Sequence, residues 1–149
     1  MRISAKEDYA IRAVLELAVA APANVKRDQI AEAQQIPAAF LENILLELKR
    51  AEIVEAQRGA DGGFRLARPA ASIAIADVIR AVAGPLATVR GTRPQALEYV
   101  GAAVPLQGLW VAVRASLRNV LETVTLADLA ANELPQEVRR VIDDPSSWE

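Results

Sequence analysis

The first half of the chain carries three amphipathic helical patterns, separated by polar or proline-containing breaks. The first pattern covers residues 7–21 and ends at Pro22, the second covers residues 27–34, and the third follows Pro37. Their apolar positions recur at the three- and four-residue spacing of one helix face. These positions are Ala10, Val14, Leu17, Ala18 and Ala21 in the first, Ile30 and Ala31 in the second, and Leu41, Ile44, Leu45 and Leu48 in the third. The sequence therefore predicts three helices before residue 51.

The break between the second and third patterns is short. It consists of Gln35, Ile36 and Pro37. Proline is favoured at the first position of a helix, so the third helix is predicted to start at Pro37. Two short helices joined by a turn of this length have the spacing of a helix-turn-helix. Many small helical domains share that spacing, so it does not by itself indicate DNA binding.

A hairpin pattern follows the third helix. Residues 53–57 form a strand-like run, residues 58–63 are rich in glycine, and residues 64–66 resume the alternation. Arg58, Arg65 and Arg68 lie at or beside the turn. A helix-turn-helix followed by a basic hairpin is typical of a winged helix, in which the third helix enters the major groove and the hairpin arginines contact phosphates or the minor groove. The alternative is an ordinary hairpin with solvated arginines.

The pattern of the second half of the chain predicts two more helices joined by an irregular connection. Residues 75–83 form a helical pattern closed by Gly84 and Pro85, and residues 86–105 are irregular apart from a possible short helix over 94–103 with Leu97 and Val100 inward. A long apolar stripe then begins at residue 106, and a small body cannot cover all of it, so we expect a second copy to share it. The alternative is a helix packed within its own chain. The predicted dimer interface comprises Leu109, Trp110, Val113, Leu117, Val120, Leu121 and Val124.

Composition narrows the chemistry. The 149 residues include no cysteine and no histidine, and the net charge is −2. Disulfides, thiolate or imidazole metal sites and Cys or Ser-His nucleophiles are therefore excluded. No paired-carboxylate arrangement stands out, so we expect neither an enzyme, nor a metal, nor a cofactor. The apolar runs fall short of the roughly 20 residues of a membrane span, and the first residues turn acidic where a signal peptide is apolar. We expect a soluble cytoplasmic protein without a membrane partner.

Several strings of residues follow a known pattern. They are Met1-Arg2-Ile3-Ser4-x-Lys6-x-x-Tyr9-Ala10-x-Arg12-Ala13, Phe40-Leu41-Glu42-Asn43-Ile44-Leu45 and the wing Arg58-Gly59-x-x-Gly62-Gly63-Phe64-x-Leu66-Ala67-Arg68. Together they resemble the Rrf-two family of winged-helix transcription regulators. This family includes the iron–sulfur cluster assembly regulator, the nitric-oxide-sensing repressor and the cysteine-metabolism repressor. Leu109-Trp110 and Val124-Thr125-Leu126-Ala127-Asp128-Leu129 match further downstream, so that the likeness covers roughly residues 1–130.

The resemblance implies a mainly α fold with a small β-wing. Its parts are a winged helix-turn-helix DNA-binding domain (1–83), a linker or sensor-like segment (84–105), a long dimerisation helix and its end (106–131) and a C-terminal tail (132–149). It also implies a homodimeric repressor or activator, with repression as the expected mode, that binds a palindrome in double-stranded DNA. The residues that would contact DNA are Ala38, Ala39, Glu42 and Asn43 on the recognition helix, Arg58 and Arg65 in the wing, and Arg2, Lys6 and Tyr9 near the N-terminus.

The chain also departs from the family pattern. Gln35 stands where the family usually has glycine, and Pro37 stands where it usually has serine or threonine. The second helix also lacks a hydroxyl side chain as its N-terminal cap, because Lys26 occupies the cap position. The three cysteines that cluster-binding members carry in the segment 84–105 are missing, so we expect no iron–sulfur cluster. A small molecule or a protein partner then remains as the candidate signal. The alternative function is a protein-interaction dimer that has kept the fold and lost sequence-specific DNA binding.

Overall fold

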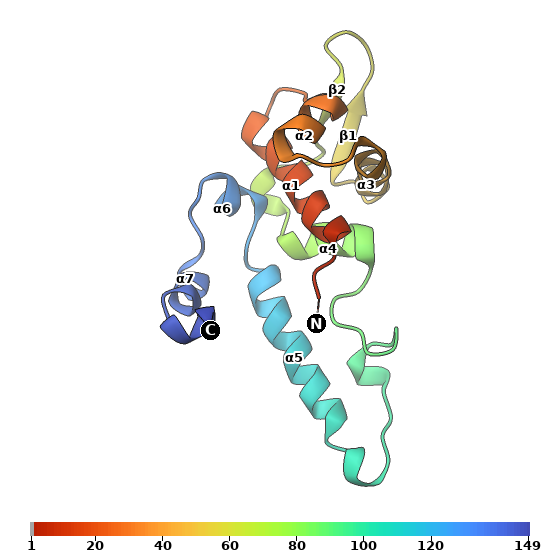
Figure 1. Cartoon of the computed structure of the whole chain (residues 1–149), viewed down its shortest axis with the longest axis vertical. Helices are drawn as coiled ribbons and strands as arrows, with labels where there is room; N and C mark the ends of the chain where they lie inside the picture. The colour runs from red at the N-terminus through yellow and green to blue at the C-terminus, as the bar shows by residue number, and fades with distance from the viewer. Residues whose placement is uncertain (1) are drawn as a thin grey trace.

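The computed structural model describes residues 2–149, and Figure 1 shows a helical body from which one long helix extends. The body contains α1 (Ala5–Ala20), α2 (Arg27–Gln34), α3 (Ala38–Arg50), β1 (Val54–Gln57), β2 (Gly63–Leu66), the 3-10 turn η1 (Ala70–Ser72) and α4 (Ile75–Ala83). The 3-10 turns η2 (Pro94–Ala96) and η3 (Gly101–Ala103) precede the long helix α5 (Leu106–Leu121). The chain ends in α6 (Leu126–Ala130), α7 (Gln136–Ile142) and η4 (Pro145–Trp148).

The hydrophobic core of the body lies around α1, which packs against α2, α3, α4 and α6. Ala13, Val14 and Leu17 on α1 are fully buried, as is Leu41 on α3. The small side chains of Ala10, Ala13 and Val14, all buried, let the neighbours of this central helix approach closely while still removing apolar surface from water. The predicted fold class, mainly α with a small β-wing, is confirmed.

The first helix begins earlier than its apolar pattern indicates. Ser4 is the N-cap: its Oγ accepts the N–H of Glu7 at 3.2 Å, and Glu7 Oε2 accepts the N–H of Ser4 at 2.7 Å. This reciprocal capping box gives hydrogen-bond acceptors to two backbone N–H groups that would otherwise lack partners at the start of the helix. The helix therefore starts at Ala5 and not at residue 7, and it ends at Ala20.

The turn between α2 and α3 keeps helix-turn-helix geometry without glycine. Gln35 adopts the left-handed conformation, with φ 52° and ψ 47°, at a cost of roughly 1–2 kcal/mol for a non-glycine residue. The N–H of Ile36 reaches back to the carbonyl of Ala31 at 3.0 Å, and the Ile36 side chain is buried. Burial of Ile36 offsets the strain at Gln35. Pro37 is the N-cap of α3 rather than its first residue.

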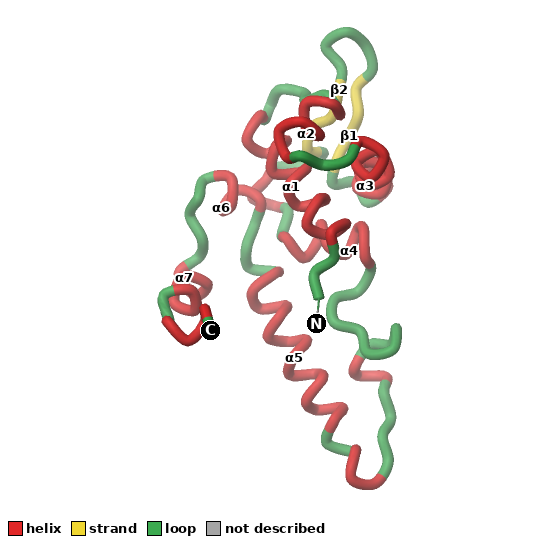
Figure 2. Tube along the Cα trace, in the orientation of Figure 1, coloured by secondary structure: helices red, strands yellow, loops and turns green. Residues whose placement is uncertain are grey.

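The wing is a two-stranded antiparallel hairpin that is anchored to the helical body (Figure 2). Phe64 in β2 exchanges both backbone hydrogen bonds with Val25, each 2.8 Å long, which adds a bridge beside the hairpin. Gly63 is required at this junction because a Cβ there would lie 2.7 Å from the carbonyl oxygen of Val25, and its φ is +143°. The hairpin therefore leaves the body at a fixed position next to the start of α2.

Two expectations for the second half are wrong. Residues 94–103 do not form one helix but the separate turns η2 and η3, and Val100 between them is 86% exposed although Leu97 is buried. The long helix ends at Leu121, and Val124 lies beyond it, directly after the turn at residues 122–123. The carbonyl of Val124 accepts the N–H of Ile75 at 2.9 Å, and its side chain is buried in the core of its own chain. Val124 therefore cannot serve a dimer interface.

Candidate nucleic-acid interface

The third helix separates a buried face from an exposed one. Leu41, Ile44, Leu45 and Leu48 are buried, whereas Ala38, Ala39, Glu42 and Asn43 are exposed. The two small residues at the start of the helix leave room for a close approach, and the two polar residues follow one turn later. A carboxylate can accept from the amino group of cytosine, and an Asn amide can pair bidentately with adenine.

A groove lies in front of this exposed face. Its volume is about 580 Å³, and its walls come from the start of α2, from α3 and from both strands of the wing. Glu42 and Asn43 line it together with Leu46, Lys49 and Phe64. Leu46 is 45% exposed, whereas four other apolar residues of this helix are buried. A leucine at this position suits contact with a thymine methyl group.

Leu46 was not among the sequence-predicted site residues. The signal was present, because Leu46 lies one turn after Glu42 and off the buried stripe. Arg27 is the other residue that the sequence did not indicate. It begins α2, and its Nη1 lies 3.4 Å from Glu42 Oε2 across the groove. This ion pair connects the two helices of the helix-turn-helix.

Two residues near the N-terminus are engaged within the protein. Lys6 Nζ lies 2.9 Å from Glu47 Oε1, on the side of α3 that faces α1. Tyr9 is half-buried, and its ring contacts Phe40 edge to face at a centroid distance of 6.4 Å. Arg12 lies over the same Tyr9 ring, 4.8 Å from its centroid. These contacts join the beginning of α1 to α3, so that the Lys6 ammonium and the Tyr9 ring are both engaged within the protein.

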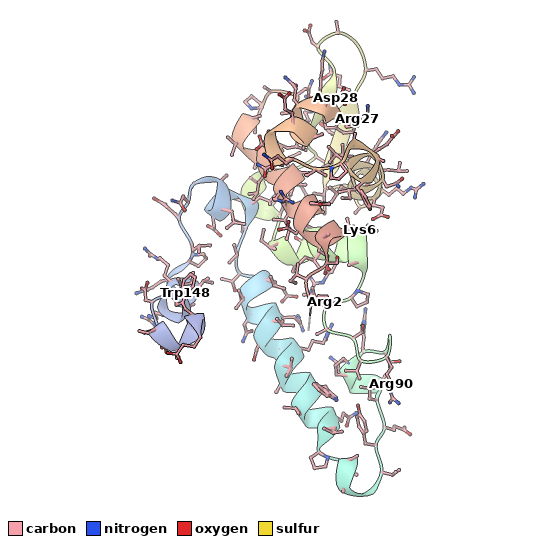
Figure 3. All side chains as sticks on the ribbon, viewed as in Figure 1. Arg2, Lys6, Arg27, Asp28, Arg90 and Trp148 are labelled. Atoms are coloured by element: carbon pink, nitrogen blue, oxygen red, sulfur yellow. The ribbon has the colours of Figure 1, made fainter. Side chains whose placement is uncertain are left out.

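Arg2 lies before α1, and Figure 3 shows it below Lys6, towards the upper end of α5. It is exposed, and it lines a cavity of about 240 Å³ together with Gly84, Leu117 and Leu121. This cavity lies at the junction of the N-terminal segment, the end of α4 and the long helix α5. The structure therefore places Arg2 on the α5 side of the body, away from the groove at α3.

The two wing arginines differ in their surroundings. Arg65 pairs with Glu55, the residue directly opposite it in the hairpin register, with Nε 2.5 Å from Oε1. Arg58 is exposed in the turn after β1, and no ion pair within residues 2–149 involves it. Of the two, Arg58 is therefore the side chain whose positive charge is uncompensated and available to a polyanion.

An ionic cluster joins the body to α5 at some distance from the groove. Glu122, directly after α5, accepts hydrogen bonds from Arg118 on α5 and from Arg80 on α4. These hydrogen bonds, first from Arg118 and then from Arg80, lower the pKa of Glu122 to about 2. The cluster fixes the end of the long helix relative to α4.

The long helix presents two faces. Trp110, Val113, Leu117 and Leu121 are half-buried against their own chain, whereas Leu109 and Val120 are 51% and 40% exposed. None of the 16 residues of α5 is buried, even though all of them lie within the described part of the chain. Of the predicted interface residues, Leu109 and Val120 are thus the most accessible to a second copy.

Comparison with known proteins now identifies the architecture. A sequence profile of the Rrf2 (Rrf-two) family, described as "Iron-dependent Transcriptional regulator", matches residues 3–132. The chain belongs to the Rrf2 family. Its relatives include Rv1287 of Mycobacterium tuberculosis, whose name describes an HTH-type transcriptional regulator, at 48% identity over 97% of this chain and 90% of the relative. IscR of Cereibacter sphaeroides, named as an HTH-type transcriptional regulator, is 33% identical over 90% of each chain.

Two solved structures share this architecture. CymR, the global cysteine regulator of B. subtilis, superposes with a TM-score of 0.76 at 29% identity, covering 89% of this chain and 98% of that protein. T. potens IscR gives a TM-score of 0.73 at 29% identity, covering 89% and 88%. The family and these relatives are transcriptional regulators and not enzymes. No helix within residues 2–149 is long and apolar enough to cross a membrane.

The family description raises the question of an iron site. Between residues 84 and 105 the chain offers Glu98 as its one carboxylate and has neither cysteine nor histidine. Iron–sulfur clusters are held by thiolates, with imidazole as the common substitute. Among residues 2–149 no three carboxylates gather in a metal-binding arrangement either. The residues present therefore do not fit such a cluster.

Proposed function

We propose that this Rrf2 protein is a homodimeric transcriptional regulator of the cytoplasm that binds a palindromic DNA operator without an iron–sulfur cluster. The observation that carries the proposal is the exposed start of α3 beside a wing whose Arg58 has no carboxylate partner among the described residues. Repression is the simplest mode of action, because a dimer that covers a promoter excludes other proteins from it.

Dimer formation is supported by α5. Its outer face exposes Leu109 and Val120, and a helix of 16 residues without a single buried side chain is poorly satisfied in an isolated chain. A two-fold axis at this face is the common solution for a self-complementary apolar surface. It would also present two copies of α3 to successive major grooves, which requires a palindromic site.

Regulation by a small molecule fits the cavity beside α5. The 240 Å³ space is lined mainly by apolar groups, among them Ile79, Leu86, Leu117 and Leu121, with Arg2 at one side. A ligand there would contact both the DNA-binding body and the long helix, so its binding energy would depend on how the two are arranged. A protein partner on the same surface is the second candidate signal.

The rival function is a protein-interaction dimer that retains the fold without sequence-specific DNA binding. It is favoured by the ion pairs of Lys6 and Arg65, which reduce the positive charge offered to DNA, and by the net charge of −2. The exposed Glu42, Asn43 and Arg58 favour the regulator.

A selection experiment separates the two functions. The full chain is incubated with a random-sequence duplex library, the bound duplexes are sequenced, and the promoter of its own gene is tested by gel shift. The regulator predicts enrichment of one inverted repeat. Retention of duplexes with no shared sequence would favour the rival.

A further inference from the structure

Arg27 is placed to control how the recognition helix uses Glu42. It is the first residue of α2, and its guanidinium contacts two carboxylates: Nη1 lies 3.4 Å from Glu42 Oε2, and Nε lies 3.2 Å from Asp28 Oδ1. The Arg27 side chain is 41% exposed and that of Glu42 is 70% exposed, so the pair lies at the open side of the groove. Both residues line this groove together with Asn43 and Leu46.

We propose that Arg27 is a specificity-determining positioning residue that holds the Glu42 carboxylate for base recognition. This inference rests on the proposed function, since it assumes that α3 enters the major groove. The contact to Arg27 uses Oε2, and the other oxygen of Glu42 remains free to accept a hydrogen bond from the amino group of cytosine. Arg27 itself need not touch a base.

The electrostatics of the groove support this role. A glutamate that enters the major groove approaches two rows of phosphates, and like charges raise the free energy of the complex. Arg27 compensates the Glu42 charge at the place where the repulsion acts. Its planar guanidinium can contact Glu42 and Asp28 at once through separate N–H groups, which a lysine ammonium at this position does not reproduce in geometry.

The pair also restricts the Glu42 side chain. A glutamate on an exposed helix face samples several rotamers, and fixing it on binding costs free energy. A contact that already holds the carboxylate in the free protein reduces that cost. Preorganisation of this kind favours the duplex that matches the held geometry over duplexes that would need a different one.

A phosphate contact is the other role open to Arg27, and it makes a different prediction. An arginine that binds only the DNA backbone contributes equally to every sequence, and its removal weakens all duplexes and lowers the salt dependence. Its effect would also be additive with that of a change at Glu42. An arginine that positions Glu42 acts through that residue, so the two effects are coupled.

The test uses the inverted repeat selected by the wild-type full chain from a random duplex library, and duplexes with each base substituted in turn. Fluorescence anisotropy measures the affinities of wild type, Arg27→Met, Glu42→Gln and the double variant. Arg50→Met is the matched control, because Arg50 is exposed in the last turn of α3. Arg27→Gln replaces Arg27→Met if circular dichroism shows that the methionine variant does not fold.

We expect Glu42→Gln to lower discrimination at one base pair, and Arg27→Met to lower it at that same pair by about fivefold or more. In the Glu42→Gln background, Arg27→Met should no longer change the discrimination at that base pair. In the wild-type background, Arg50→Met should leave the discrimination intact. A uniform loss of affinity across all duplexes, additive with Glu42→Gln, overturns the inference and makes Arg27 a phosphate contact. If the wild type selects no sequence at all, the proposed function itself fails.

Discussion

Lys6 on α1 is paired with Glu47 on α3, with Nζ 2.9 Å from Oε1. The pair joins residues 41 positions apart in the sequence, and Glu47 is not among the residues that line the groove with Glu42 and Asn43. Lys6 therefore connects two helices of the body, a role different from the phosphate contact that the family resemblance implies.

This pairing predicts that Lys6 affects stability more than DNA affinity. Lys6→Met should lower the free energy of unfolding by up to about 1 kcal/mol, the range of partly exposed ion pairs. Affinity for the selected duplex should fall less than it does for Arg58→Ala. Urea denaturation and anisotropy titrations measure the two quantities. A loss of affinity as large as that of Arg58→Ala, with unchanged stability, would restore Lys6 as a DNA contact.

Arg58 should contribute to binding without contributing to sequence preference. Its charge has no carboxylate partner in the described chain, so Arg58→Ala should weaken binding to every duplex by a similar factor. The slope of log affinity against log salt should decrease in magnitude by about 1 for each wing that contacts a phosphate. Arg140→Ala, an exposed arginine on the distant α7, is the control and should change neither value. An unchanged salt slope for Arg58→Ala would exclude a wing contact.

The outer face of α5 should decide the oligomeric state. Leu109→Glu together with Val120→Glu places charges on two of its exposed apolar positions, and a buried unpaired charge is costly. We expect this variant to be monomeric by sedimentation equilibrium and to bind the inverted repeat weakly. Val19→Glu is the control, since Val19 is 70% exposed on α1, far from α5 in the sequence. A dimer that survives both glutamates would place the interface elsewhere.

Acid should weaken the attachment of α5 through Glu122. The pKa of Glu122 is lowered to about 2, below its ordinary value of 4.5. A lowered folded-state pKa means that the stabilisation is complete above the ordinary pKa and is lost as the pH falls from about 4.5 towards about 2. The stability difference between wild type and Glu122→Gln should therefore shrink over that pH range in chemical denaturation. A difference that stays constant down to pH 2 would contradict the assignment.

The helices of the DNA-binding body were predictable because their signals are local. The second helix matches residues 27–34 as expected, and the buried stripe of α3 follows the spacing of its leucines and isoleucine. The end of α5 was not predictable from periodicity, because Val124 continues the apolar spacing although the helix has already ended at Leu121 and the chain turns at residues 122–123. The position of Val124 is set by the fold, through the hydrogen bond from the N–H of Ile75 to its carbonyl and the adjacent β-bridge between Ala74 and Thr125.

The candidate site likewise has features that local sequence predicts and features that depend on tertiary packing. Exposure of Glu42 and Asn43 follows from the helix pattern, and the Arg65–Glu55 pair follows from the hairpin register once the turn is known. The Arg27–Glu42 pair depends on how two helices cross, which short-range spacing does not contain. The same holds for the pairing of Lys6. Sequence thus indicated which side chains are available, and tertiary packing determines which of them are already engaged.

The most direct test of the central claim is a titration of the wild-type full chain against three duplexes of equal length: the selected inverted repeat, the same repeat with one half scrambled, and a fully scrambled duplex. A dimeric, sequence-specific regulator should bind the intact repeat with a stoichiometry of two chains per duplex. Its affinity for the intact repeat should be at least about 1,000-fold higher than for the fully scrambled duplex, and its affinity for the half-scrambled repeat should lie between these two values. Equal affinity for all three duplexes, or one chain bound per intact repeat, would contradict it.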